Sequence, residues 1–176
     1  MPTERFPVSI IIECTPLANR WQSERWEPVA VERAAIESNP AAPAPAALDP
    51  GGMRWRFDGH EIELHRSEAE GYFLNTTTPE PKVFVMWRPC EDAERPPIRP
   101  YVVTVSYNEA ARLMDGGERV EAVPMLPEIL AWMTPFVAAH YKPEPRRKVR
   151  RNDPFADRDE TGAPRRQRDR GRFESG

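Results

Sequence analysis

Apolar and β-branched residues recur at strand spacing through most of the first 125 positions. Residues 7–14 (PVSIIIEC) form a nearly continuous apolar run, which predicts a strand buried on both faces. Shorter runs, bounded by Pro, Gly or polar residues, predict further strands. These are residues 28–33, 71–75, 82–88, 101–106 and 118–123, the last of them exposed.

A hairpin is expected around Asp58-Gly59, which lies between the predicted strands 53–57 and 61–65. This dipeptide supplies the positive φ angles that a tight type I′ turn demands. In the second strand, Ile62 and Leu64 alternate with the polar residues Glu61, Glu63 and His65. The alternation indicates a sheet with one solvated face.

Two helices are predicted in the second half of the chain. Ser106 and Glu109 have the spacing of a capping box, so a helix should run from there to about Asp115 and end at Gly116-Gly117. The last helix should begin near Leu126, with Pro127 in its first turn and an apolar stripe along one side. Pro135 lies inside that stripe and should kink the helix or split it after about Met133. The stripe consists of Ile129, Leu130, Met133, Phe136, Val137 and His140.

The elements together predict an α+β fold. We expect a mostly antiparallel, twisted sheet of about six to eight strands or a partly open barrel, with the C-terminal helix on a sheet face or plugging the barrel. Residues 7–142 form this single domain, and the Pro/Ala-rich residues 37–52 form a flexible inserted loop. Residues 143–176 have too few apolar side chains to offset their ordering entropy, so we expect a disordered basic tail.

Charge is unevenly distributed along the chain. Residues 141–176 hold 12 Lys and Arg against 7 Asp and Glu, a balance of +5, whereas the other 140 residues carry −8. An acidic body makes nucleic-acid binding an unlikely function and suits a protein partner. The longest apolar runs are too short for a signal peptide or a membrane helix, so we expect a cytoplasmic protein with Cys14 and Cys90 reduced.

Catalytic and metal-binding signatures are weak. Glu61, Glu63 and His65 share a strand face and could supply three metal ligands, but a solvated face explains them more simply. Cys14 reads as an inert core thiol, and Cys90 lies in an acidic loop that should blunt its reactivity. The chain contains no nucleotide-binding glycine loop and no nucleophile elbow. We therefore predict no catalytic residue, no metal and no cofactor.

Tryptophans and arginines are the candidate contacts for a protein partner. Trp21 and Trp26 lie in a polar stretch (NRWQSERWEP), and one of them is expected on the surface as an anchor. The basic cluster near residue 150 could bind an acidic protein, RNA or a membrane, or be a solvated tail. The predicted contacts are Trp21, Arg25, Trp26, Arg66, Tyr72, Arg146, Arg147, Lys148, Arg150 and Arg151.

Several stretches together resemble an uncharacterised proteobacterial family, domain of unknown function 3305. They are WQSERWEPVAV, ELHRSEAEGYFLN, PKVFVMWRP, VTVSYNEA and GERVEAVPMLPEILAWMTPFVAAHY, within residues 8–151. Some members of that family are labelled molybdopterin-guanine dinucleotide biosynthesis protein A. Here the first strand is followed by ECTPLANRW, which lacks the glycines of that nucleotidyltransferase. The resemblance also implies genomic proximity to molybdenum-dependent formate dehydrogenase genes.

Two functions follow from this reasoning. The first is a non-enzymatic accessory protein that assists assembly or maturation of a molybdenum-dependent formate dehydrogenase, with that enzyme or its maturation factors as partner and no membrane contact. The alternative is a small enzyme or cofactor-binding protein of molybdopterin-guanine dinucleotide biosynthesis. Its site would draw on His65, Arg66, Glu68 and Arg88. A regulatory module that binds an acidic protein or nucleic acid is a third possibility.

Overall fold

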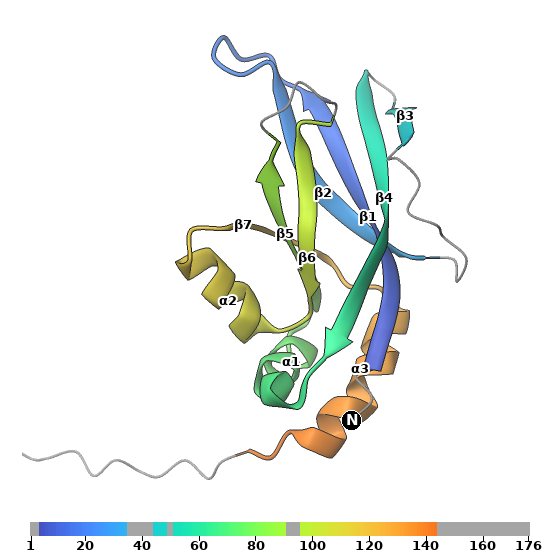
Figure 1. Cartoon of the computed structure of the whole chain (residues 1–176), viewed down its shortest axis with the longest axis vertical. Coiled ribbons are helices and arrows are strands. Elements are labelled where there is room, and N and C mark those ends of the chain that lie inside the picture. Colours follow the sequence, from blue (N-terminus) through green and yellow to red (C-terminus); the bar gives the residue numbers. More distant parts are fainter. Residues whose placement is uncertain (1–3, 35–43, 49–50, 91–95, 144–176) are drawn as a thin grey trace, which may run out of the picture. The chain divides into compact units, whose positions relative to one another are not determined.

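The computed structural model describes residues 4–34, 44–48, 51–90 and 96–143 (Figure 1). The chain divides into two compact units, residues 1–142 and residues 143–176. The second unit lies outside the described residues except for Pro143, so the predicted disorder of the tail stays a prediction. None of the described helices combines the length and apolar character needed to cross a membrane.

The described residues form two antiparallel sheets and three α-helices, which confirms the α+β class. In place of the single sheet that was expected there are two, and they do not close into a barrel. The first has the order β2-β1-β4-β3 and comprises β1 (Glu4–Pro16), β2 (Glu24–Arg33), β3 (Ala44–Leu48) and β4 (Gly52–Leu64). The second has the order β6-β5-β7 and comprises β5 (Lys82–Pro89), β6 (Ile98–Thr104) and β7 (Arg119–Pro124). The helices are η1 (Arg66–Glu68), α1 (Ala69–Thr76), α2 (Tyr107–Asp115) and α3 (Pro127–His140).

The hydrophobic core lies between the two sheets. Strand β1 is buried from Val8 to Ile12, as the continuous apolar run predicted. Two edges of the sheets approach each other, β2 near β7 and β4 near β6. Helices α1 and α3 lie at the opposite end of the sheets from the β1–β2 loop (Figure 1). There Phe6 of β1 contacts Trp132 of α3 with ring centroids 5.2 Å apart.

The hairpin predicted at Asp58-Gly59 is wrong, because β4 runs unbroken from Gly52 to Leu64. The dipeptide forms a β-bulge instead: Asp58 and Gly59 together lie opposite the single residue Ser9 of β1. Gly59 has a φ of +84°, the left-handed conformation that such a bulge requires. A positive φ is compatible with a tight turn, but at Gly59 it bends a long strand.

Two further segments differ from the sequence predictions. Residues 71–75, predicted as a strand, belong to helix α1, whose buried residues Ala69, Tyr72 and Asn75 recur every third position. Within the expected loop 37–52, Ala44–Leu48 form strand β3 and pair with the first part of β4. Pairing with an existing edge supplies the stability that a Pro/Ala-rich segment lacks by itself.

Helices α2 and α3 begin where the capping signals predicted. The Ser106 side chain accepts a hydrogen bond from the Glu109 backbone N–H at 3.1 Å, and Gly117 closes α2 with a φ of +84°. Pro127 occupies the first turn of α3. Pro135 was predicted to kink the last helix or to split it, and the split does not occur, because α3 is continuous from Pro127 to His140.

Candidate functional site

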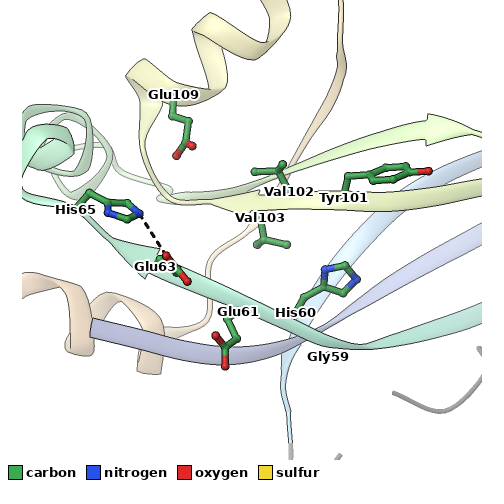
Figure 2. A pocket seen from close by; sticks show the side chains of 9 residues that line it. All are labelled: Gly59, His60, Glu61, Glu63, His65, Tyr101, Val102, Val103 and Glu109. Atoms are coloured by element: carbon green, nitrogen blue, oxygen red, sulfur yellow. Dashed lines mark ion pairs between the residues drawn. The ribbon is translucent and has the colours of Figure 1, made fainter. Parts of the chain in front are cut away.

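A hollow of about 380 Å³ opens between strands β4 and β6 beside the start of α2 (Figure 2). Its volume falls in the range of binding sites for small ligands or single side chains. Strand β4 contributes most of its polar lining, β6 contributes the apolar part, and α2 adds one carboxylate. The lining residues are Gly59, His60, Glu61, Glu63, His65, Tyr101, Val102, Val103 and Glu109.

Alternation along β4 positions the polar lining. Ile62 and Leu64 are buried in the core, so Glu61, Glu63 and His65 lie on the opposite face, as the sequence predicted. Arg5 of β1 is the cation of this face: its guanidinium lies 3.1 Å from the Glu61 carboxylate and 3.0 Å from that of Glu63. The His65 imidazole is 3.5 Å from the Glu63 carboxylate, and a dashed line joins the two side chains in Figure 2.

The β-bulge holds a partly buried polar network beside the hollow. The Ser9 hydroxyl donates to the Asp58 carboxylate at 2.5 Å, and the Arg56 guanidinium donates to both at 2.9 Å. These hydrogen bonds lower the pKa of Asp58. His60 follows the bulge. Burial lowers the pKa of its imidazole, and the negative charge of Asp58 opposes this shift only in part. His60 is therefore neutral at physiological pH.

Helices α1 and α2 close the other end of the hollow. The Tyr72 hydroxyl accepts from the His65 backbone N–H at 3.0 Å and donates to the Glu63 carbonyl at 3.4 Å, which fixes the end of β4. Burial raises the pKa of Tyr72 to about 12. The Glu109 carboxylate accepts from the Thr104 hydroxyl at 2.5 Å rather than from the Ser106 backbone.

The lining of the hollow is mainly acidic and suits a cationic group. Three carboxylates line it, and the Arg5 guanidinium pairs with two of them, Glu61 and Glu63. No group of three or more His, Cys, Asp or Glu in the described part of the chain is arranged to hold a metal ion. Cys14 is a buried cysteine and Cys90 a half-buried one, and neither lines the hollow.

A second candidate site is the tip of the β1–β2 hairpin. Trp21 is 88% exposed, the largest exposed fraction among the large hydrophobic side chains of the described residues. The loop is held by a hydrogen bond of 2.8 Å from the Leu17 N–H to the Ser23 carbonyl and by one of 3.0 Å from the Trp21 N–H to the Asn19 side chain. The Arg20 guanidinium lies 5.6 Å from the indole centroid. The tip therefore presents an aromatic ring and a cation on ordered backbone.

Four other predicted contacts occupy different environments. Trp26 is half-buried, with its ring 4.8 Å from that of Trp55, so it belongs to the packed part of the hairpin. Arg25 lies on the same strand, and its exposed guanidinium is 2.6 Å from Glu27. Arg66 is exposed on η1, at the other end of the sheets. The predicted partner contact at Tyr72 does not fit the structure, because the Tyr72 side chain is fully buried and cannot contact a partner.

The basic cluster of the tail lies outside the described residues. Its predicted contacts stay predictions. They are Arg146, Arg147, Lys148, Arg150 and Arg151.

The four residues proposed for a cofactor site are not brought together. His65 lines the hollow, but the Glu68 carboxylate is occupied by the Ser106 hydroxyl at 2.7 Å and the Arg112 guanidinium at 2.6 Å. Arg88 binds Glu118 through two hydrogen bonds and lies 5.3 Å from the Tyr101 ring. Figure 2 places Tyr101 and His65 at opposite ends of the hollow.

Sequence reasoning missed half of the hollow. His60 fell between the two strands of the predicted hairpin, Glu109 was predicted only as part of a capping box, and Tyr101 was not singled out. The signal for the β4 half was the alternation of Glu61, Glu63 and His65. No local pattern could have joined these residues to β6 and α2, because the pairing depends on how the two sheets meet.

Comparison with known proteins identifies a family but no activity. No match was found among curated proteins or among solved structures. A family model described as "Protein of unknown function (DUF3305)" matches residues 7–150. Because this match covers most of the sequence, the chain belongs to the DUF3305 family of proteins of unknown function.

Proposed function

We propose that this chain is a non-enzymatic accessory protein that binds a partner protein through the tip of its β1–β2 hairpin. The exposed ring of Trp21, 88% accessible on an ordered loop, is the observation that carries the proposal. A tryptophan can bury on the order of 200 Å² on binding, and tryptophan and arginine are the residues most enriched at binding hot spots. Arg20, which lies against the indole, supplies the second of these residue types.

The ordered loop favours binding further. A side chain on preorganised backbone loses less conformational entropy when it docks than one on a flexible segment. The Asn19 side chain and the Ser23 carbonyl both accept backbone hydrogen bonds within the loop, so the backbone that carries Trp21 is held in place. Trp26 of β2 packs against Trp55 of β4, which joins the hairpin to the rest of the sheet.

The partner that we propose belongs to the assembly or maturation of a molybdenum-dependent formate dehydrogenase. The family resemblance supports this choice through the genes that accompany relatives. The test is affinity purification of the tagged full chain from cells that express the enzyme. We expect formate dehydrogenase subunits or their maturation proteins to be enriched.

Two variants locate the binding surface. Trp21→Ala should reduce recovery of the partner by about 30-fold, since loss of a hot-spot tryptophan costs at least about 2 kcal/mol. Met114→Ala removes another exposed hydrophobic side chain, on α2, and should leave recovery unchanged. Equal recovery with Trp21→Ala would refute the hairpin as the contact surface, and no enrichment of the formate dehydrogenase system would refute the proposed partner.

Calorimetric titration tests the non-enzymatic assignment directly. We expect no heat of specific binding with GTP or molybdopterin compounds. Saturable binding of either would favour the alternative, a cofactor-binding protein of molybdopterin-guanine dinucleotide biosynthesis.

A further inference from the structure

The hollow between β4 and β6 lies between two strand edges that have no strand partner in the described part of the chain. Strand β3 pairs only with Gly52–Arg56 of β4, so from Phe57 onward β4 is paired only with β1. Strand β6 pairs only with β5. The two open edges approach each other across the hollow, as Figure 2 shows.

Hydrogen bonds around β4 show which of its backbone groups face the hollow. The Ala34 N–H donates to the Pro7 carbonyl at 3.2 Å, so Pro7 of β1 is turned toward β2. Its cross-strand neighbour Glu61 is then turned away from β1, because antiparallel pairs alternate between bonded and non-bonded. The Glu63 carbonyl points the same way, since it accepts from Tyr72. The backbone groups of Glu61 and Glu63 therefore face the open edge.

The same alternation orients β6. Both backbone groups of Lys82 bind the Asn75 side chain, at 2.9 and 2.7 Å, so Lys82 faces away from β7. Met86, four residues along β5, then faces β6 and pairs with Val102. The next residue of β6, Val103, faces outward toward the hollow. In the described part of the chain, backbone groups without a strand partner thus border the hollow on both sides, although the Glu63 carbonyl is already bonded to the Tyr72 hydroxyl.

The charge of the lining selects the ligand. Glu61, Glu63 and Glu109 bring three carboxylates, and the Arg5 guanidinium compensates one charge. Strand edges of this kind recruit extended peptides through main-chain hydrogen bonds, while pockets along the edge choose the side chains. The surplus of carboxylates favours arginine or lysine in those pockets.

We propose that the hollow binds an extended segment of a partner protein, which adds as a strand at the open edge of β4 and places an Arg or Lys side chain among the carboxylates of Glu61, Glu63 and Glu109. This site is separate from the Trp21 hairpin, which lies at the opposite end of the sheets from α1. A protein that uses both surfaces gains avidity from two individually modest contacts.

The test uses a capped synthetic peptide of alternating valine and arginine, about nine residues long to match one strand, added to the full-length chain. Calorimetry measures its affinity, and amide hydrogen exchange followed by NMR locates it. We expect saturable binding that weakens with salt, and new protection of the Glu61, Glu63 and Val103 amides. The same peptide with glutamate in place of arginine should not bind.

Matched variants distinguish the effect of charge inside the hollow on peptide affinity from the effect of the protein's net charge. Glu63→Gln should weaken peptide binding and Glu63→Lys should weaken it by about tenfold or more, since reversal changes an attraction into a repulsion. Glu80→Lys makes the same change of charge at a side chain that is 81% exposed outside the hollow, and should leave the affinity unchanged. Circular dichroism checks that each variant is folded.

Three results would overturn the proposal: no binding of the arginine peptide, equal binding of the two peptides, or binding without protection of the three amides. Protection that rises instead with protein concentration would assign the edge to a second copy of this chain, which also contradicts the proposal. Loss of the Trp21 contact has no bearing on this outcome, so the two proposals fail separately.

Discussion

Gly71 lies where helix α1 passes closest to the start of α2, and its replacement tests how the two helices are joined. A Cβ atom built on Gly71 meets the Ser106 hydroxyl oxygen far inside the 3.0 Å that real Cβ contacts respect, and lies 3.1 Å from the Asn108 backbone nitrogen. Ser106 is fully buried, caps α2 and donates to Glu68. The hydroxyl therefore cannot move without losing both hydrogen bonds.

We expect Gly71→Ala to lower the free energy of unfolding, which is the opposite of what helix propensity alone predicts. Replacing a helical glycine with alanine gains about 1 kcal/mol by propensity alone. Overpacking costs about 2 kcal/mol. Loss of the cap on α2 costs about 1 kcal/mol and the stranded Glu68 carboxylate about 1 kcal/mol more. We expect a net loss of about 3 kcal/mol, which lowers the melting temperature by roughly 10 °C.

Urea denaturation followed by circular dichroism measures this loss in the full chain. Gly116→Ala is the matched control, because Gly116 has an ordinary φ of −75° and its Cβ would be 3.3 Å from the nearest carbonyl oxygen. Its free energy of unfolding should change by less than about 0.5 kcal/mol.

A double-mutant cycle makes the reasoning refutable. Ser106→Ala removes the clashing oxygen, so the double variant Gly71→Ala/Ser106→Ala should be within about 1 kcal/mol of Ser106→Ala alone. If Gly71→Ala is neutral or stabilising, or if the two losses simply add, then contact with the Ser106 hydroxyl is not what Gly71 provides.

Two further predictions concern buried groups at the same end of the sheets. Asn75→Ala should lower the free energy of unfolding, measured by urea denaturation, by about 3 kcal/mol, because it leaves the Lys82 backbone and the Val105 carbonyl without their hydrogen bonds. The control Gln22→Ala, in the exposed loop, should lower it by less than about 0.5 kcal/mol. Equal losses in the two variants would contradict this prediction. Tyr72 has its pKa raised from 10.0 to about 12, so its protonated form stabilises the fold fully below pH 10 and that contribution is lost as the pH rises toward 12. Tyr72→Phe should flatten the dependence of unfolding free energy on pH between 10 and 12, and an unchanged slope would show that Tyr72 does not cause it.

Elements whose signals are local were predicted well. The start of α2 follows from Ser106 and Glu109, and its end from Gly117, since each of these acts within a few residues of itself. Strand β1 follows from its own apolar run. In such segments the nearest neighbours along the chain decide the conformation.

Asp58-Gly59 was misread because the decision is not local. A positive φ at Gly59 is compatible with a tight turn and with a bulge. What selects the bulge is β1, which is long enough to pair with β4 on both sides of it, from Glu4 to Cys14. That partner lies about 50 residues away in the sequence.

Helix α1 was misread for a related reason. Its aromatic residues Tyr72 and Phe73 favour strands, and Gly71 disfavours a helix. Contacts with other elements select the helix. Asn75 forms hydrogen bonds with β5 and with the end of β6, and Gly71 leaves room for the start of α2 to pack closely. The spacing of Ala69, Tyr72 and Asn75 was a sequence signal for it.

The charge of the open β4 edge also decides which strands can add to it. Two copies of this chain that met edge to edge along β4 would bring Glu61 and Glu63 against like charges, which destabilises cross-strand pairs. Acidic residues on an open edge thus oppose self-association, a hazard for any unpaired strand. The same carboxylates attract a segment that carries arginine or lysine. One set of side chains therefore keeps this edge open against copies of itself and available to a basic partner.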